Sequence, residues 1–327
     1  MRWLNRRLRS ERGASAVLVG LLMVPLLGCL AISIDVGVMY AEHAQLQNGA
    51  DAAALAIAQD CADGACTDPD AHAKNFTEDN ANDGAANFSY TLRTDLKNVT
   101  VKDSTLTAKG ENALQLYFTR FLPSGRTETT VGAEATAEWG PPRESMIVLP
   151  LAISLCEFQP ALDGTLVLLR YDQNPACTTP DGHPIPGGFG WLDRVEDECE
   201  AAIDLTVARA PSEPGNSFPG ICDATLTDLE GQTILVPIFD RAYNPSGNEV
   251  TNGQAASYRL YAFAAFTITG WKFSGGPALT NTDPAAPRCT GNCRGIQGYF
   301  DRWVSVDAAS AVLGGPDLGA SIVRLSK

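Results

Sequence analysis

Cysteine is the residue type with the clearest chemistry in this sequence of 327 residues. Cys29 lies alone within an apolar stretch, and eight more cysteines follow that stretch: Cys61, Cys66, Cys156, Cys177, Cys199, Cys222, Cys289 and Cys293. An even number of cysteines, all placed after one apolar segment, indicates disulfides in an oxidising compartment. The short spacings Cys61–Cys66 and Cys289–Cys293 allow local bridges, whereas the pairing of the other four is open. A zinc site is disfavoured, because C-x4-C and C-x3-C fit the usual thiolate pairs poorly.

Other groups that could take part in catalysis are scattered. The sequence has three histidines, His43, His72 and His183, and no G-x-S-x-G, H-E-x-x-H, Walker or G-x-G-x-x-G motif. A carboxylate pair for sugar chemistry would have to come from aspartates that are more typical of solvated turns: Asp163, Asp172, Asp181, Asp193, Asp204 and Asp240. We therefore expect no enzyme activity, no cofactor, no metal site and no small-molecule substrate.

One segment can position the rest of the chain, because Ala14–Ile34 runs for 21 residues without a charged side chain. As a helix it would be about 31 Å long, close to the hydrocarbon thickness of a bilayer. We expect a single transmembrane helix that is retained as an anchor. The alternatives are a cleaved secretory signal and a lipoprotein signal with Cys29 as the lipidated residue. Apolar residues that continue beyond Cys29, and the absence of an A-x-A cleavage site, favour the retained anchor.

Charge is distributed unevenly around this segment. Residues 1–12 contain five arginines and one glutamate, a net charge of +4. Because the whole chain has a net charge of −14, the remaining residues carry −18. Basic residues before a membrane segment predict that residues 1–13 lie in the cytoplasm and that the bulk is extracytoplasmic. The acidic bulk disfavours nucleic acid as a partner, because it repels phosphate.

Helix-forming residues continue beyond the segment, so we expect one helix over residues 14–60, half in lipid and half protruding. Small residues on its protruding half would let another helix approach closely: Gly37, Ala41, Ala44, Gly49, Ala52, Ala53 and Ala56.

The remaining sequence predicts two modules, which makes the fold class α+β. Residues 61–140 read as a small α+β module that includes a helix over Asn112–Phe121, and Gly140-Pro141-Pro142 marks the boundary. Residues 141–327 read as a β-rich domain held by disulfides. Its Ser257–Trp271 stretch is apolar at both odd and even positions, which predicts a central strand buried on both faces.

A family resemblance rests on a combination of short motifs. These are Arg12-Gly13, the uncharged stretch with Pro25, Asp35-x-Gly37, Gln45-Leu46-Gln47 and Asp51-Ala-Ala-Ala-Leu-Ala56. Over about residues 12–60 the chain resembles the TadE/TadG-like proteins of the Flp (tight adherence) pilus-assembly system. The resemblance implies a membrane-anchored, pilin-like component whose partners are other pilus-assembly or pilin-like subunits.

Two departures from the family pattern narrow this implication. Prepilin-like members carry a glutamate five residues after the cleavage-site glycine, and Leu18 stands at that position when Gly13 is the glycine. The D-x-S-x-S motif of a von Willebrand factor A domain, which TadG-like members often carry, does not occur in this sequence. Two hypotheses follow: a non-catalytic component of a pilus-assembly or secretion apparatus that acts through helix packing and protein–protein contacts, or an adhesin-like surface binding module tethered by one helix.

Overall fold

The computed structural model describes residues 4–107, 109–121, 125–158, 164–171, 177–179, 182–212, 218–251, 255–274, 284–302 and 311–326, without the side chains of residues 4–14 and of Phe121. The candidate carboxylates of Asp163, Asp172 and Asp181 lie outside the described residues.

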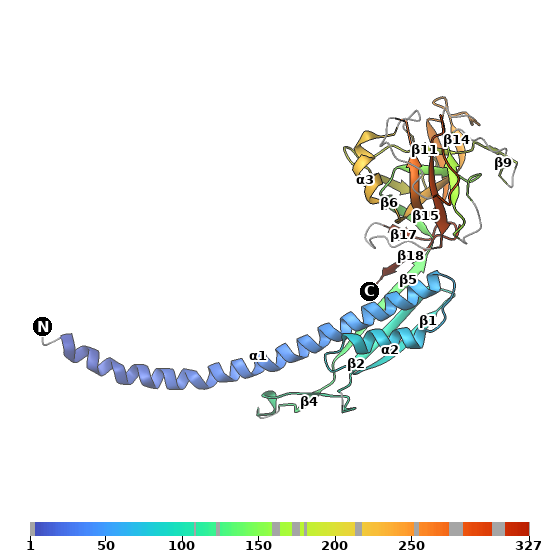
Figure 1. The fold of residues 1–327 in the computed structure, drawn as a ribbon. Helices are drawn as coiled ribbons and strands as arrows, with labels where there is room; N and C mark the ends of the chain where they lie inside the picture. The colour runs from blue at the N-terminus through green and yellow to red at the C-terminus, as the bar shows by residue number, and fades with distance from the viewer. Residues whose placement is uncertain are drawn as a thin grey trace.

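The long N-terminal helix is confirmed. Helix α1 runs over Leu4–Ala62, 59 residues, and so begins before the uncharged segment. Figure 1 shows its N-terminal half extending away from the rest of the chain, while its C-terminal half lies on a sheet. The helix ends where Gly64 takes a positive φ of 84°, a conformation that glycine adopts without steric cost. We call the part of the chain after α1 the head.

A four-stranded antiparallel sheet with the order β1-β2-β5-β18 packs against the C-terminal half of α1. Its strands are β1 (Ala86–Arg93), β2 (Asn98–Thr105), β5 (Gly132–Gly140) and β18 (Ile322–Leu325). Helix α2 (Pro69–Asn80) begins at Asp68, whose carboxylate accepts the N–H of Ala71. The shared core holds Ile57 of α1, Val99 of β2 and Trp139 of β5. The strand nearest the C-terminus therefore completes a sheet that begins near residue 86.

The predicted helix over Asn112–Phe121 is wrong. Residues of this stretch form β3 (Leu114–Gln115), which pairs with β4 (Glu128–Thr129), and the short 3-10 helix η1 (Thr119–Phe121). The N–H groups of residues 117–119 donate to the Asp35 carboxylate on α1. A tertiary contact thus replaces the local hydrogen bonds that a helix would have made.

The β-rich part is built on a seven-stranded sheet with the order β11-β7-β14-β15-β16-β8, in which β13 also pairs with β15. These strands are β11 (Phe189–Trp191), β7 (Leu151–Ser154), β14 (Thr233–Tyr243), β15 (Ser257–Lys272), β16 (Gly295–Asp301), β8 (Val167–Arg170) and β13 (Ala210–Pro211). A second sheet joins β12 (Ala201–Asp204), β6 (Pro142–Ile147) and β17 (Ala311–Leu313). The remaining elements are the pair β9 (Cys177–Thr178) and β10 (Pro184–Ile185), the 3-10 helix η2 (Gly220–Cys222) and α3 (Asp223–Asp228).

Strand β15 is buried on both faces, as its sequence predicts. One face joins a core with Phe266, and the other joins a core with Phe263. Strict alternation along Ser257–Trp271 predicts Leu260 on the face of Phe266 and Trp271 on the face of Phe263, and for these two residues the prediction is wrong. Register shifts next to Leu260 and after Ile268 place Leu260 with Phe263, and Trp271 with Phe266. Each bulge adds one residue to a strand and so exchanges the faces beyond it.

Four disulfides join the eight cysteines that follow the uncharged segment. The two local bridges are Cys61–Cys66 and Cys289–Cys293. The connectivity left open by the sequence is Cys156–Cys177 and Cys199–Cys222, each a bridge between successive cysteines. The β-rich region is therefore held by disulfides, and the α+β fold class is confirmed. The module boundaries at residues 13, 60 and 140 stay a prediction.

Candidate functional site

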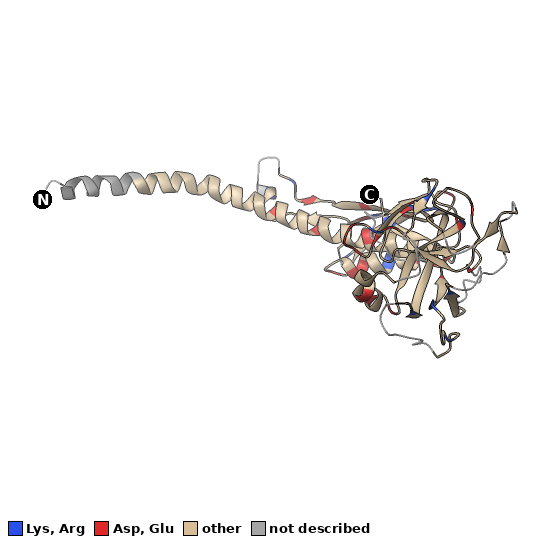
Figure 2. Ribbon diagram, turned by 90° about the horizontal axis from the view of Figure 1, so that it is seen from above, with Lys and Arg blue, Asp and Glu red and all other residues tan. Residues whose placement is uncertain are grey.

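The uncharged segment is exposed over its described residues, apart from Gly28 and Ala31, which are half-buried. Its large apolar side chains, from Val17 to Ile34, face away from the chain's own core. Among the residues that Figure 2 draws in colour, the charged residues lie on the half of α1 near the head and on the head itself. Ser33 keeps its hydroxyl satisfied by donating to the Cys29 carbonyl, 2.8 Å away, as hydroxyl groups do in membrane helices. Among the described residues, α1 is the one helix that is long enough and apolar enough to cross a membrane. This finding points to a membrane anchor.

Asp35, the first charged residue after the segment, is fully buried at 0% exposure. Its carboxylate accepts the N–H of Tyr117 at 2.9 Å, of Phe118 at 3.0 Å and of Thr119 at 2.6 Å. A charged acceptor shared by three backbone donors is well satisfied without water. Asp35 therefore fixes the hairpin formed by β3 and β4 to α1 at the point where the uncharged segment ends.

The predicted helix-packing residues divide between two faces of α1. Gly49 and Ala53 are buried against the head, where a Cβ on Gly49 would lie 3.2 Å from Cα of Thr77. Gly37, Ala41 and Ala44 are exposed, and Ala52 and Ala56 are half-buried. Spacings of four and three residues put Gly37, Ala41 and Ala44 on one side of the helix. We call these three residues the small-residue face.

A buried carboxyl group lies where α1, α2 and β2 meet. Asp103 is 2% exposed, and its Oδ2 has no hydrogen-bond partner in the part of the chain that the structure describes. Burial raises the pKa of Asp103 to about 7, although the Thr77 hydroxyl, whose Oγ1 lies 3.5 Å from Oδ1, lowers it. This carboxyl group is therefore partly protonated at neutral pH.

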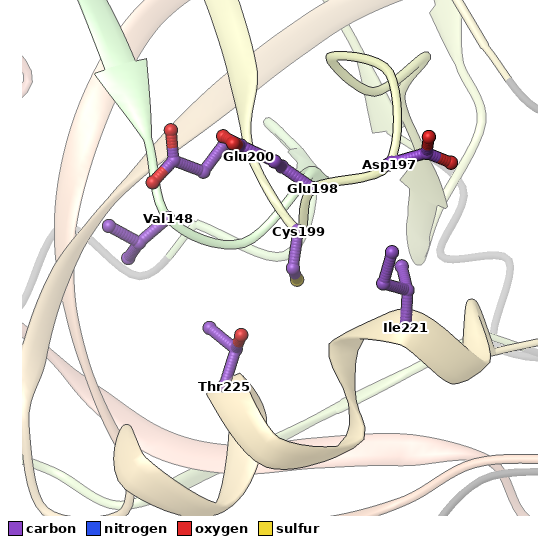
Figure 3. Close-up of a pocket in the computed structure, with 7 residues that line it drawn as sticks. All are labelled: Val148, Asp197, Glu198, Cys199, Glu200, Ile221 and Thr225. Carbon is purple, nitrogen blue, oxygen red and sulfur yellow. The ribbon is translucent and has the colours of Figure 1, made fainter.

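The β-rich part carries an open depression of about 460 Å³. Its lining includes the Cys199 half of a disulfide, Thr225 of α3 and three acidic residues. Figure 3 shows the side chains of Asp197 and Glu200 pointing to opposite sides of the depression. Carboxylates that diverge in this way cannot share a ligand or act as an acid–base pair on one bond.

The remaining candidates for catalysis are not brought together. His43 Nδ1 lies 3.1 Å from the Gly132 carbonyl oxygen, and His183 Nδ1 lies 3.3 Å from Glu249 Oε2. Asp240 is 4% exposed and forms an ion pair with Arg259. Within the described residues, no three His, Cys, Asp or Glu side chains gather as metal ligands.

The contact between Asp35 and residues 117–119 was missed by reasoning from sequence. Two signals in the sequence could have indicated it: an acid that directly follows a membrane-length segment, and a distant stretch, 112–127, that has aromatic and basic residues but no acid. Neither signal states that the two regions meet, because they are more than 80 residues apart.

Comparison with known proteins adds a family assignment for the α1 region. Neither the curated proteins nor the solved structures contain a match to this chain. Residues 13–60 match the family model of the Flp pilus-assembly TadE/G-like proteins (Tad), which confirms the resemblance over the helix that carries the uncharged segment and the small-residue face.

Proposed function

We propose that this chain is a non-catalytic, membrane-anchored component of a bacterial Tad/Flp-type pilus-assembly or secretion apparatus. The uncharged segment spans the membrane once. The basic N-terminus lies in the cytoplasm and the head lies outside, where an oxidising compartment allows the four disulfides to form. The observation that carries this proposal is the family match over residues 13–60, which covers the exposed uncharged segment and the half of α1 that packs on the sheet.

The small-residue face is the surface through which the protein contacts other helices. Glycine and alanine allow two helix backbones to approach closely. The opposite face of the same helix is already buried against the head, where Leu46 is 3% exposed and Ala50 is 0% exposed. The helix can therefore bind a partner without releasing its own head.

Pilus formation in the source bacterium tests the proposal. We expect a clean deletion to abolish pili, and the wild-type gene to restore them. Ala44→Leu enlarges the small-residue face without touching the core, so we expect it to restore fewer pili at equal protein level. Thr91→Leu is the matched control, because it adds the same side chain at an exposed position of β1. Normal piliation in the deletion strain would contradict the role in assembly, and full restoration by Ala44→Leu would contradict the packing face.

Membrane topology is tested separately. A reporter enzyme that works only outside the cytoplasm should be active when it is fused after Lys327, and one that works only in the cytoplasm should be inactive. The protein should also resist alkaline extraction from membranes. A head that is reached by reagents from the cytoplasmic side would contradict the proposed orientation.

A further inference from the structure

We propose that the described parts of the hairpin that joins β3 to β4, residues 114–120 and 125–129, which we call the membrane hairpin, lie in the interfacial layer of the bilayer on the head's side and contact lipid headgroups beside α1. This inference rests on the proposed transmembrane anchor. Both views show the hairpin leaving the head and running back along α1 toward the N-terminal half of the helix (Figures 1 and 2).

The depth of the hairpin follows from the length of the helix. The uncharged segment is centred on Val24, eleven residues before Asp35. At about 1.5 Å per residue Asp35 lies about 16 Å from the membrane midplane, at the edge of a hydrocarbon layer about 30 Å thick. Residues bonded to the Asp35 carboxylate must therefore lie at this same depth.

Direct hydrogen bonds set that position. Three consecutive N–H groups, of residues 117–119, reach the Asp35 carboxylate at 2.6–3.0 Å. The contact also lowers the free-energy cost of placing the Asp35 carboxylate at the edge of the hydrocarbon layer, because a carboxylate at that depth is costly unless it is hydrogen-bonded. Asp35 and the hairpin thus satisfy each other where water is scarce.

The exposed side chains of the hairpin have the chemistry of a membrane interface. Tyr117 is 58% exposed and Phe118 is 39% exposed, although both are aromatic. Aromatic rings are enriched at the headgroup level, where one part of the ring contacts acyl chains and another part contacts water. On α1, Tyr40 is 75% exposed about one and a half turns after Asp35, which places a third ring near this level.

The charge of the hairpin favours anionic lipid. The hairpin contains Arg120 and Arg126 and one acidic residue, Glu128, a net charge of +1, although the chain as a whole has a net charge of −14. Both arginines are exposed. Each basic residue near an anionic membrane surface contributes about 1 kcal/mol of attraction. A protein partner would not require this coincidence of depth, aromatic rings and positive charge, so lipid is the occupant that we propose.

Depth-dependent quenching tests the inference in the full-length protein. Cys29→Ser removes the free thiol, and Tyr117→Cys adds one that is labelled with an environment-sensitive nitrobenzoxadiazole dye. The protein is reconstituted into phosphatidylcholine vesicles with a minor share of phosphatidylglycerol, and some of the acyl chains carry bromine near the headgroup. The matched control is Leu96→Cys, an exposed apolar position in the β1–β2 turn, at the end of the sheet away from the hairpin.

We expect bromine to quench the dye at position 117 several-fold more strongly than the dye at position 96, with blue-shifted emission at 117 alone. Asp35→Ala should reduce quenching at 117, since it releases the hairpin without shortening the uncharged segment. Arg120→Gln with Arg126→Gln should reduce quenching more in vesicles with phosphatidylglycerol than in vesicles of phosphatidylcholine alone.

Water-like emission and equal, weak quenching at positions 117 and 96, in protein that still resists alkaline extraction, would overturn the inference and leave the anchor intact. Protection from aqueous quenchers without bromine quenching would also overturn it, because the hairpin would then contact protein. Release of the protein by alkaline extraction would instead overturn the anchor itself.

Discussion

Asp103 provides a test of how the N-terminal sheet is held to α1, through the substitution Asp103→Asn. Its carboxyl group is 2% exposed and faces Gly49 of α1 and Thr77 of α2. Asparagine has almost the same shape and cannot ionise. At high pH the wild type must bury the charged Asp103 carboxylate between α1, α2 and β2. The substitution removes that charge and keeps the packing.

The size of the effect follows from the pKa of the folded chain, about 7, against about 3.9 for an aspartate in an unfolded chain. Because the folded state holds the proton more tightly, stability is complete below about pH 4 and falls as pH rises to about 7. The full difference corresponds to about 4 kcal/mol at 1.36 kcal/mol per pKa unit, and we expect about 2–4 kcal/mol after local relaxation. Above about pH 7 the loss is constant.

Hydrogen exchange of the β2 amides, measured in the detergent-solubilised full chain, follows this loss. At about pH 4 we expect similar protection in the wild type and in Asp103→Asn, because the loss has barely begun at that pH. At pH 8 the variant should be more protected by about 30-fold or more, the equivalent of 2 kcal/mol. Comparing the two proteins at each pH cancels the intrinsic pH dependence of exchange. Asp95→Asn is the matched control, because Asp95 is exposed in the β1–β2 turn. A ratio of variant to wild type that stays constant from about pH 4 to pH 8 would refute the reasoning.

Two further predictions concern the β-rich part and are measured by thermal unfolding in detergent. Gly298→Ala places a Cβ 2.0 Å from the Thr267 carbonyl oxygen in the seven-stranded sheet and should destabilise the fold by about 3 kcal/mol, whereas Gly220→Ala, which meets no atom within 4 Å, should not. Replacing Cys199 and Cys222 by alanine opens a bridge across 23 residues and should lower stability by about 3 kcal/mol; an unchanged melting temperature would contradict the role of that bridge.

Local patterns in the sequence were sufficient for the helix and for the burial of the central strand. The length of an uncharged run can be read directly from the sequence, and the helix-forming residues after it predict that the helix continues. Ser257–Lys272 is apolar at odd and even positions, so its burial on both faces can be read without knowing its neighbours. The two short cysteine spacings likewise indicate their own bridges, because each loop closes on itself.

Tertiary structure decided what depends on residues far apart in the chain. The contact between Asp35 and residues 117–119 overrode the helical pattern of Asn112–Phe121, and β18 joined β5 across nearly the whole chain. Bulges moved Leu260 and Trp271 to faces that strict alternation does not predict. The physical reason is the same in each case: a periodic pattern encodes which side of an element is apolar, whereas the partner and the register are set by packing and by the need to satisfy buried polar groups.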